Sequence, residues 1–270
     1  MASVPAGRLR LPAVTEQFES EAAHRAAFRT MLAHGPSVDE RVHGSPRLAA
    51  RQRLARRLTA SLAHVLIDGL EHIPSSGPVL LAVNHTSFMD GPLVFGYVDR
   101  VVSCLVKSEA FVPAAGRAGR FLVDAAQIPV VRNTVDPGPV RLCLDILRAG
   151  GVVGIFPEGT RGTGDVRTAR PGVGYLALKT DAVVVPVAAL GTAGLMRRRS
   201  VGRPTVVMSV GRPVELEYSR RAGSLNRGEW LAATETVRLR LAALVAETRR
   251  HHPAPVHTAA PVETNLEVQQ

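Results

Sequence analysis

Two side chains that follow a single apolar run have the types needed for general-base chemistry. Residues 79–83 are all aliphatic, which is typical of a buried strand, and His85 and Asp90 come directly after them. An imidazole oriented by a carboxylate can take a proton from a hydroxyl group. Their spacing would place the two side chains about 140° apart on one helix, so they can meet only if the chain turns between them. We therefore expect His85 at the end of the strand and Asp90 in the first turn of the following helix.

Taken alone, this pair is equally compatible with a helix-capping aspartate beside a loop histidine. Two further polar segments bear on the choice, because each of them also follows an apolar run. Lys107-Ser108-Glu109 follows residues 101–106, and Glu158-Gly159-Thr160-Arg161 follows residues 152–156. If the three runs are neighbouring strands of a parallel sheet, all three polar segments lie at the same edge, where α/β proteins bind their ligands. That arrangement favours the general base.

The elements that must position these residues alternate between strand and helix patterns. Such alternation predicts an α/β fold with a mixed, largely parallel sheet flanked by helices, preceded by an N-terminal helical extension. Pro129 indicates an edge or irregular position for its strand. The predicted strands are residues 79–83, 101–106, 127–131, 152–156, 183–188 and 205–210. The predicted helices are residues 46–67, 120–126, 139–149, 171–180 and 226–249.

The composition limits the classes of partner. The formal net charge is +10 and the pI is about 10.9, which favours anionic lipids, nucleic acids or phosphorylated substrates. Aromatic residues make up only 4% of the chain and do not alternate with basic runs, which argues against nucleic acid. Cys104 and Cys143 lie singly in apolar segments, so we expect two buried thiols, with no metal site and no disulfide.

The chain is predicted to divide into an N-terminal helical extension (residues 1–67), a main domain (68–250) and a disordered tail (251–270). No run reaches the roughly 20 apolar residues of a transmembrane helix, and the first residues do not resemble a signal peptide. We therefore expect a cytoplasmic protein without a transmembrane helix. The helix predicted at 46–67 alternates leucine with arginine, so it either rests on an anionic membrane or packs on its own domain with its arginines in water.

Four sequence blocks carry a resemblance to a known family. They are NHxxxxD at residues 84–90, Lys-Ser-Glu at 107–109 with Ile-Pro-Val-Val-Arg at 128–132, FPEGTR at 156–161, and Val-Pro-Val-Ala at 185–188. In order and spacing, over about residues 68–215, the chain resembles the glycerolipid acyltransferases typified by 1-acyl-glycerol-3-phosphate acyltransferase. The resemblance implies transfer of a fatty acyl group from acyl-CoA or acyl carrier protein to the hydroxyl of a lysophospholipid, most simply 1-acyl-glycerol-3-phosphate.

The same resemblance implies a mechanism without a covalent intermediate. His85 would deprotonate the acceptor hydroxyl, and Asp90 would hold the imidazole tautomer and stabilise the imidazolium. Ser87 lies close by, but we expect it to stabilise the turn and not to act as a nucleophile. The reaction needs no metal and no cofactor beyond the acyl donor.

The resemblance also implies a substrate-binding set. Arg161 and Lys107 would bind the phosphate of the acceptor, and Glu158 would orient Arg161 or the acceptor hydroxyls. The expected partners are the lysophospholipid, the acyl donor and an anionic membrane surface at the inner face of the cell membrane, without nucleic acid. The remaining members of the set are Arg132, a third candidate for the phosphate, Gly159, whose backbone could approach a ligand closely, and Thr160.

The second block departs from the family pattern. Extra residues occur between Pro113 and Gly119, and Ala126 stands where the family usually has glycine. These departures motivate an alternative with the same chemistry and another acceptor, such as an amino-acid lipid or a glycolipid. A more remote alternative is a basic module that binds membranes or nucleic acid without catalysis, which would leave the His85–Asp90 pair unexplained.

Overall fold

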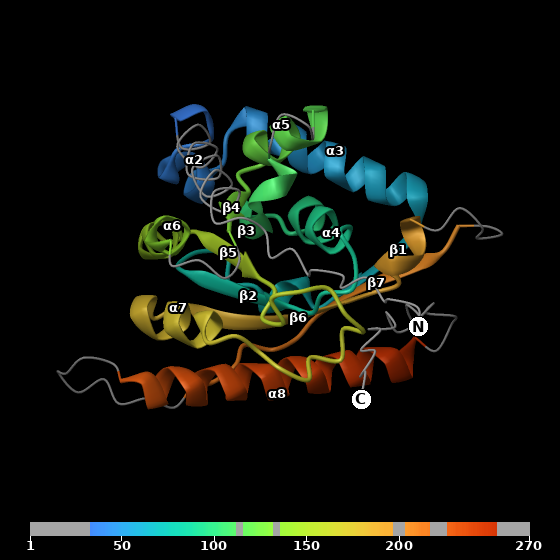
Figure 1. Cartoon of the computed structure of the whole chain (residues 1–270). Helices are drawn as coiled ribbons and strands as arrows, with labels where there is room; N and C mark the ends of the chain where they lie inside the picture. The colour runs from blue at the N-terminus through green and yellow to red at the C-terminus, as the bar shows by residue number, and fades with distance from the viewer. Residues whose placement is uncertain (1–32, 112–115, 132–135, 197–202, 217–225, 253–270) are drawn as a thin grey trace, which may run out of the picture.

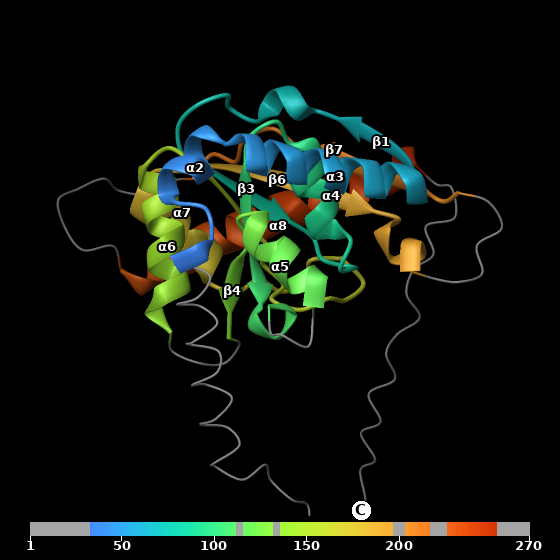
Figure 2. The same ribbon diagram turned by 90° about the horizontal axis from the view of Figure 1, so that it is seen from above.

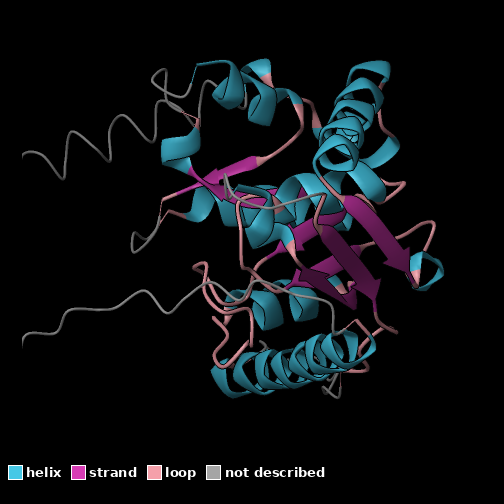
Figure 3. Ribbon diagram, turned by 90° about the vertical axis from the view of Figure 1, so that its right-hand side faces the viewer, coloured by secondary structure: helices cyan, strands magenta, loops and turns pink. Residues whose placement is uncertain are grey.

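The computed structural model describes residues 33–111, 116–131, 136–196, 203–216 and 226–252 as an α/β fold. A mixed sheet forms the middle layer and helices cover both of its faces (Figures 1 and 3). The strands are β1 (His64–Asp68), β2 (Val79–Val83), β3 (Val102–Lys107), β4 (Ile128–Val130), β5 (Val152–Ile155), β6 (Val183–Leu190) and β7 (Thr205–Val210). The helices are α2 (Val38–His43), α3 (Pro46–Leu62), α4 (Asp90–Tyr97), α5 (Gly116–Asp124), α6 (Pro137–Arg148), α7 (Gly172–Thr180) and α8 (Arg227–His251).

The strand order places the polar segments together. It runs β1-β7-β6-β2-β5-β3-β4, and every neighbouring pair is parallel except β6 and β7. The strands β2, β5 and β3 are consecutive in the sheet and parallel, so their carboxyl ends point to one edge. The prediction of a mixed, largely parallel sheet is confirmed, and β4, which contains Pro129, is an edge strand as predicted.

Two apolar layers fix the sheet between the helices. On one face, α6, α7 and α8 pack their buried residues, such as Ile146, Val173 and Leu241, against the strands. On the other face, Leu93 and Val94 of α4 cover the central strands, and α3 lies over α4 (Figure 2). Cys104 and Cys143 are buried free thiols, as predicted, and burial raises the pKa of each to about 12.

The N-terminal helix is shorter than predicted. Ser45 accepts a hydrogen bond from the Leu48 amide and Pro46 occupies the first turn, which confirms the expected start. The helix ends at Leu62, and residues 64–68 form β1, which pairs with β7. The prediction of helix through Ile67 is therefore wrong, because the alternation of half-buried and exposed residues from His64 to Asp68 belongs to an edge strand.

The predicted division into an extension, a main domain and a tail can be compared with the structure only in part. Residues 1–32 and 253–270 lie outside the described residues, so the first part of the predicted extension and most of the predicted tail stay predictions. The final helix begins after Asn226, whose side chain accepts from the Glu229 amide in a capping box, and it continues to His251. Among the helices described, none is long and apolar enough to cross a membrane.

Candidate active site

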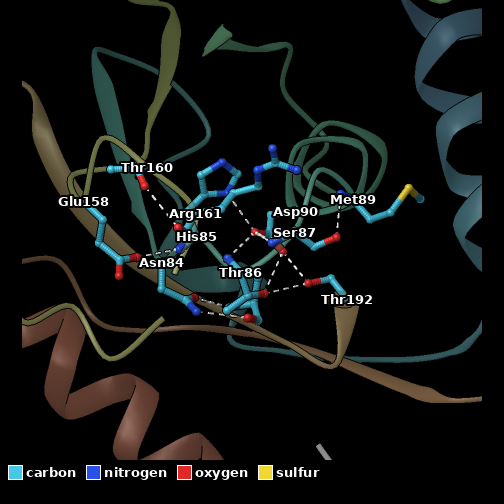
Figure 4. A network of polar contacts seen from close by, with 11 residues as sticks. Asn84, His85, Thr86, Ser87, Met89, Asp90, Glu158, Thr160, Arg161 and Thr192 are labelled. Atoms are coloured by element: carbon cyan, nitrogen blue, oxygen red, sulfur yellow. Dashed lines mark hydrogen bonds and ion pairs between the residues drawn. The ribbon is translucent and has the colours of Figure 1, made fainter. Parts of the chain in front are cut away.

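Asp90 is the centre of a buried hydrogen-bond network at the carboxyl end of β2 (Figure 4). The aspartate is fully buried, and its Oδ2 atom lies 2.9 Å from Nδ1 of His85. The backbone amides of Thr86 and Ser87 each donate to the same oxygen at 2.8 Å. On the other oxygen, Oδ1 accepts from the hydroxyl of Thr192. The carboxylate therefore binds the turn before α4 and the imidazole at the same time, and it does not cap α4, which has no side-chain cap. The role of His85 as a general base stays a prediction.

His85 is held on three sides and still reaches the surface. Its side chain is 15% exposed, and its ring stacks on Phe156 with ring centroids 4.2 Å apart. Its amide donates to Glu158 at 2.7 Å, and its carbonyl accepts from the Gly162 amide at 3.0 Å. Because Asp90 contacts Nδ1, a proton accepted by the ring would go to the second nitrogen, Nε2.

Asn84 connects this turn to the neighbouring strand β6. Its side chain donates to the Ala189 carbonyl at 3.1 Å and accepts from the Ala189 amide at 2.7 Å. The Val-Pro-Val-Ala block lies within β6, next to β2 in the sheet. These contacts give the first and fourth blocks a structural reason to occur together, since β6 carries Thr192 to Asp90.

The carboxylate of Glu158 joins the turn after β5 to the turn that carries His85. Desolvation raises the pKa of its carboxyl, although hydrogen bonds from the backbone of His85 and Val166 partly oppose that shift. The Glu158 carboxylate is therefore bound by the main chain of His85 and Val166. The prediction that Glu158 orients Arg161 or the acceptor stays a prediction.

Gly159 and Thr160 have local roles in the turn after β5. Gly159 adopts a left-handed backbone (φ +69°), and a Cβ there would lie 2.3 Å from Nε of Arg170. Arg170 thus occupies the space that the sequence suggested for a ligand. The Thr160 hydroxyl is exposed and donates to the Arg161 carbonyl at 3.0 Å.

The candidate phosphate-binding side chains are exposed at the same edge. Arg161 follows β5 and lies beside His85 in the close view of Figure 4, while Lys107 ends β3, the next strand in the sheet. Arg132 lies outside the described residues. Ser87 is buried, and its hydroxyl accepts from the Met89 amide at 3.2 Å, which confirms the turn-stabilising role.

Thr192 and the stacked ring of Phe156 are the site contacts that sequence reasoning missed. Thr192 comes directly after β6, so its position at the carboxyl end of a strand beside β2 was the available signal. Phe156 is part of FPEGTR, yet the motif alone gives no indication of what its ring contacts. Within the described ranges, no group of three or more His, Cys, Asp or Glu side chains is arranged to hold a metal ion.

Part of the chain is similar in sequence to known acyltransferases. Residues 64–190 match the family model described as Acyltransferase. A 1-acyl-sn-glycerol-3-phosphate acyltransferase of Bacillus subtilis is 30% identical over 128 residues, which are 47% of this chain and 63% of that protein. The chloroplastic enzyme LPAT1 of Arabidopsis thaliana is 32% identical over 143 residues, which are 50% of this chain and 38% of that protein.

A solved structure shares the fold. The crystal structure of the 1-acyl-sn-glycerophosphate acyltransferase of Thermotoga maritima superposes with a TM-score of 0.54. The alignment has 20% identity and covers 88% of this chain and 94% of that one. By contrast, the sequence matches to the curated relatives from Arabidopsis and Bacillus span less than two thirds of either relative's length.

Proposed function

We propose that this protein, whose residues 64–190 match the acyltransferase family model, transfers a fatty acyl group to the free hydroxyl of 1-acyl-glycerol-3-phosphate. The donor would be a thioester, either acyl-CoA or acyl carrier protein. The observation that supports the proposal most directly is the 2.9 Å contact between His85 and Asp90 at the edge where FPEGTR ends. The names of the curated relatives, which act on this acceptor, support the choice of substrate.

In the proposed reaction, Nε2 of His85 takes the proton of the acceptor hydroxyl as its oxygen attacks the thioester carbonyl. Asp90, fixed by two amides and Thr192, stabilises the imidazolium that forms. The tetrahedral intermediate then collapses and expels the thiolate, which takes the proton from the imidazolium and leaves as the thiol. No enzyme nucleophile takes part, so the acyl group passes directly from donor to acceptor.

The phosphate of the acceptor would be bound by Arg161 and Lys107. A guanidinium can contact two phosphate oxygens at once, and the ammonium adds a second positive charge. Their exposure at the edge beside His85 supports this role. The second lysine of the chain, Lys179, lies in the last turn of α7. It comes shortly before the first residue of β6, which is at the opposite edge of the sheet.

Acyl transfer by the purified protein tests the proposal. His85→Ala should lower kcat by about 10²–10⁴-fold. Lys107→Ala should raise KM for 1-acyl-glycerol-3-phosphate, and the matched variant Lys179→Ala should leave it unchanged. A His85→Ala variant with full activity would refute the mechanism. A strong preference for a phosphate-free amino-acid lipid or glycolipid would contradict the proposed acceptor and support the alternative one.

We also propose that the protein reaches its lipid substrate from the inner face of the cell membrane, with α3 on the bilayer. Leu54, Leu58 and Leu62 are 48%, 47% and 37% exposed along one side of α3. Arg53 and Arg57 beside them are exposed and would meet anionic head groups. The opposite side is held to the domain, since Gln52 and Arg56 donate to carbonyl groups of α4 and of the turn after it.

Flotation with anionic liposomes tests this attachment. Leu54→Ser with Leu58→Ser should reduce the bound fraction, because the exposed apolar face is lost. Leu239→Ser is the matched control, since Leu239 is 53% exposed on α8. Equal binding by both variants would exclude α3 as the main contact with the membrane.

A further inference from the structure

The segment that follows FPEGTR, residues 162–166, lies between the His85 turn and the C-terminal helix α8 (Figure 1). We call it the brace. On its first side, the Gly162 amide donates to the His85 carbonyl at 3.0 Å. Gly164 packs so closely that a Cβ would lie 2.5 Å from Cγ2 of Thr86. The brace therefore contacts the turn that carries the candidate base.

On its second side, the brace is bound by two arginines of α8. Arg249 donates to the Thr163 carbonyl at 2.9 Å and to the carboxylate of Asp165. The hydrogen bond from Arg249 lowers the pKa of that carboxyl. Arg238 donates to the Val166 carbonyl at 3.0 Å. Both arginines lie beyond residue 190, outside the segment that matches the family model.

Val166 shows that these contacts maintain an unfavourable backbone. Its φ is +53°, a left-handed value that is costly for a β-branched residue, and its side chain is fully buried in the core. Such a conformation persists only where the surroundings impose it. Here Arg238 binds the carbonyl, and the amide donates to the carboxylate of Glu158.

Two paths then lead from α8 to the site. Through Asp165 and Thr163, Arg249 holds residues that follow Arg161 within four positions. Through Val166, Arg238 acts on Glu158, which also accepts from the His85 amide at 2.7 Å. The first path ends at the proposed phosphate-binding residue, and the second ends at the proposed base.

We propose that α8 positions the active site through the brace, with Arg249 setting the place of Arg161 and Arg238 setting the place of His85. The inference rests on the proposed function, because it assigns separate kinetic effects to the two arginines. Arg238 and Arg249 are positioning residues in this scheme, since neither reaches the reacting atoms itself.

Steady-state kinetics of the full chain test the two paths separately. Arg249→Ala should raise KM for 1-acyl-glycerol-3-phosphate about three- to tenfold and change kcat less than about twofold. Its effect on transfer to a monoacylglycerol, which has no phosphate, should be smaller. Arg238→Ala should lower kcat about three- to tenfold for both acceptors. Arg249→Lys should recover part of the loss, because an ammonium can still bind Asp165.

Arg240→Ala is the matched control, because Arg240 is an exposed arginine on the same helix. Amide hydrogen exchange of residues 158–166 should be faster in the Arg249 and Arg238 variants than in the wild type and the control. Kinetics and exchange equal to those of the control would overturn the proposal. Parallel changes in kcat and KM that merely follow a lowered Tm would also overturn it. A wild type without transfer to either acceptor would refute the proposed function. The exchange rates would still decide whether Arg238 and Arg249 hold the brace in place.

Discussion

The hydroxyl of Thr192 donates a hydrogen bond to Asp90, 102 residues earlier in the chain. Thr192 is fully buried, and its hydroxyl also lies 3.0 Å from that of Thr86. With two backbone amides on Oδ2, this contact fixes the carboxylate plane relative to His85. The orientation of the imidazole therefore depends on β6 as well as on the NHxxxxD turn.

Removing that hydroxyl should affect the reaction rate more than substrate binding. Thr192→Val keeps the shape and leaves Oδ1 of Asp90 with only the longer hydrogen bond from the Thr86 hydroxyl at 3.5 Å, so kcat should fall about tenfold with little change in KM. Thr192→Ser should retain most of the rate. Thr236→Val removes the hydroxyl of a helical threonine on α8 and serves as the control. An unchanged kcat in Thr192→Val would show that the two amides and the Thr86 hydroxyl suffice.

The buried carboxyl of Glu158 should give the stability a defined pH dependence. Burial raises its pKa above the ordinary value of 4.5, so the folded state holds the proton more tightly than the unfolded chain. Its contribution to the free energy of unfolding is then largest below pH 4.5 and is lost as the pH rises through the folded pKa.

Glu158→Gln should remove this dependence, because the amide stays neutral. We expect the unfolding free energy of the wild type, relative to the variant, to fall as the pH rises from about 4 to 7. Urea titrations at several pH values measure it, with Glu247→Gln as an exposed control. A relative stability that rises with pH would mean that the amides of His85 and Val166 outweigh desolvation.

Replacing Ala126 with glycine should stabilise the fold. Its φ is +61°, a region in which an alanine Cβ costs about 1–2 kcal/mol and glycine does not. Ala126→Gly should therefore raise the free energy of unfolding by roughly 0.5–1 kcal/mol, after the larger chain entropy of glycine is subtracted. The neighbouring Ala125→Gly is the control and should lower stability, because its φ is not positive. A loss of stability in Ala126→Gly would contradict the prediction.

Gly164 and Gly162 offer a matched pair within the brace. A Cβ at Gly164 would lie 2.5 Å from Thr86, and the backbone there has φ +73°, whereas nothing lies within 4 Å at Gly162. Gly164→Ala should cost about 1–3 kcal/mol of stability and displace the His85 turn, lowering kcat. Gly162→Ala should be close to neutral in both measurements. Thermal unfolding and acyl transfer, measured on both variants, decide whether the close contact matters.

Much of the fold follows from local patterns along the chain. The strand at 205–210 and the start of α3 at Ser45 and Pro46 lie where the sequence predicts them, because apolar runs and helix caps are short-range features. The end of α3 at Leu62 does not follow from local patterns, because it depends on a long-range contact. Residues 64–68 become a strand only by pairing with β7, which comes from a distant part of the chain.

The same division holds within the site. The residue types and spacing of NHxxxxD and FPEGTR determined which side chains meet at the carboxyl edge of β2 and β5, because each block is one strand end and one turn. Only the tertiary structure decided what supports them. Thr192 on Asp90, Arg249 on Asp165 and Arg238 on Val166 are hydrogen bonds between residues 102, 84 and 72 positions apart, whose pairing depends on how strands and helices pack.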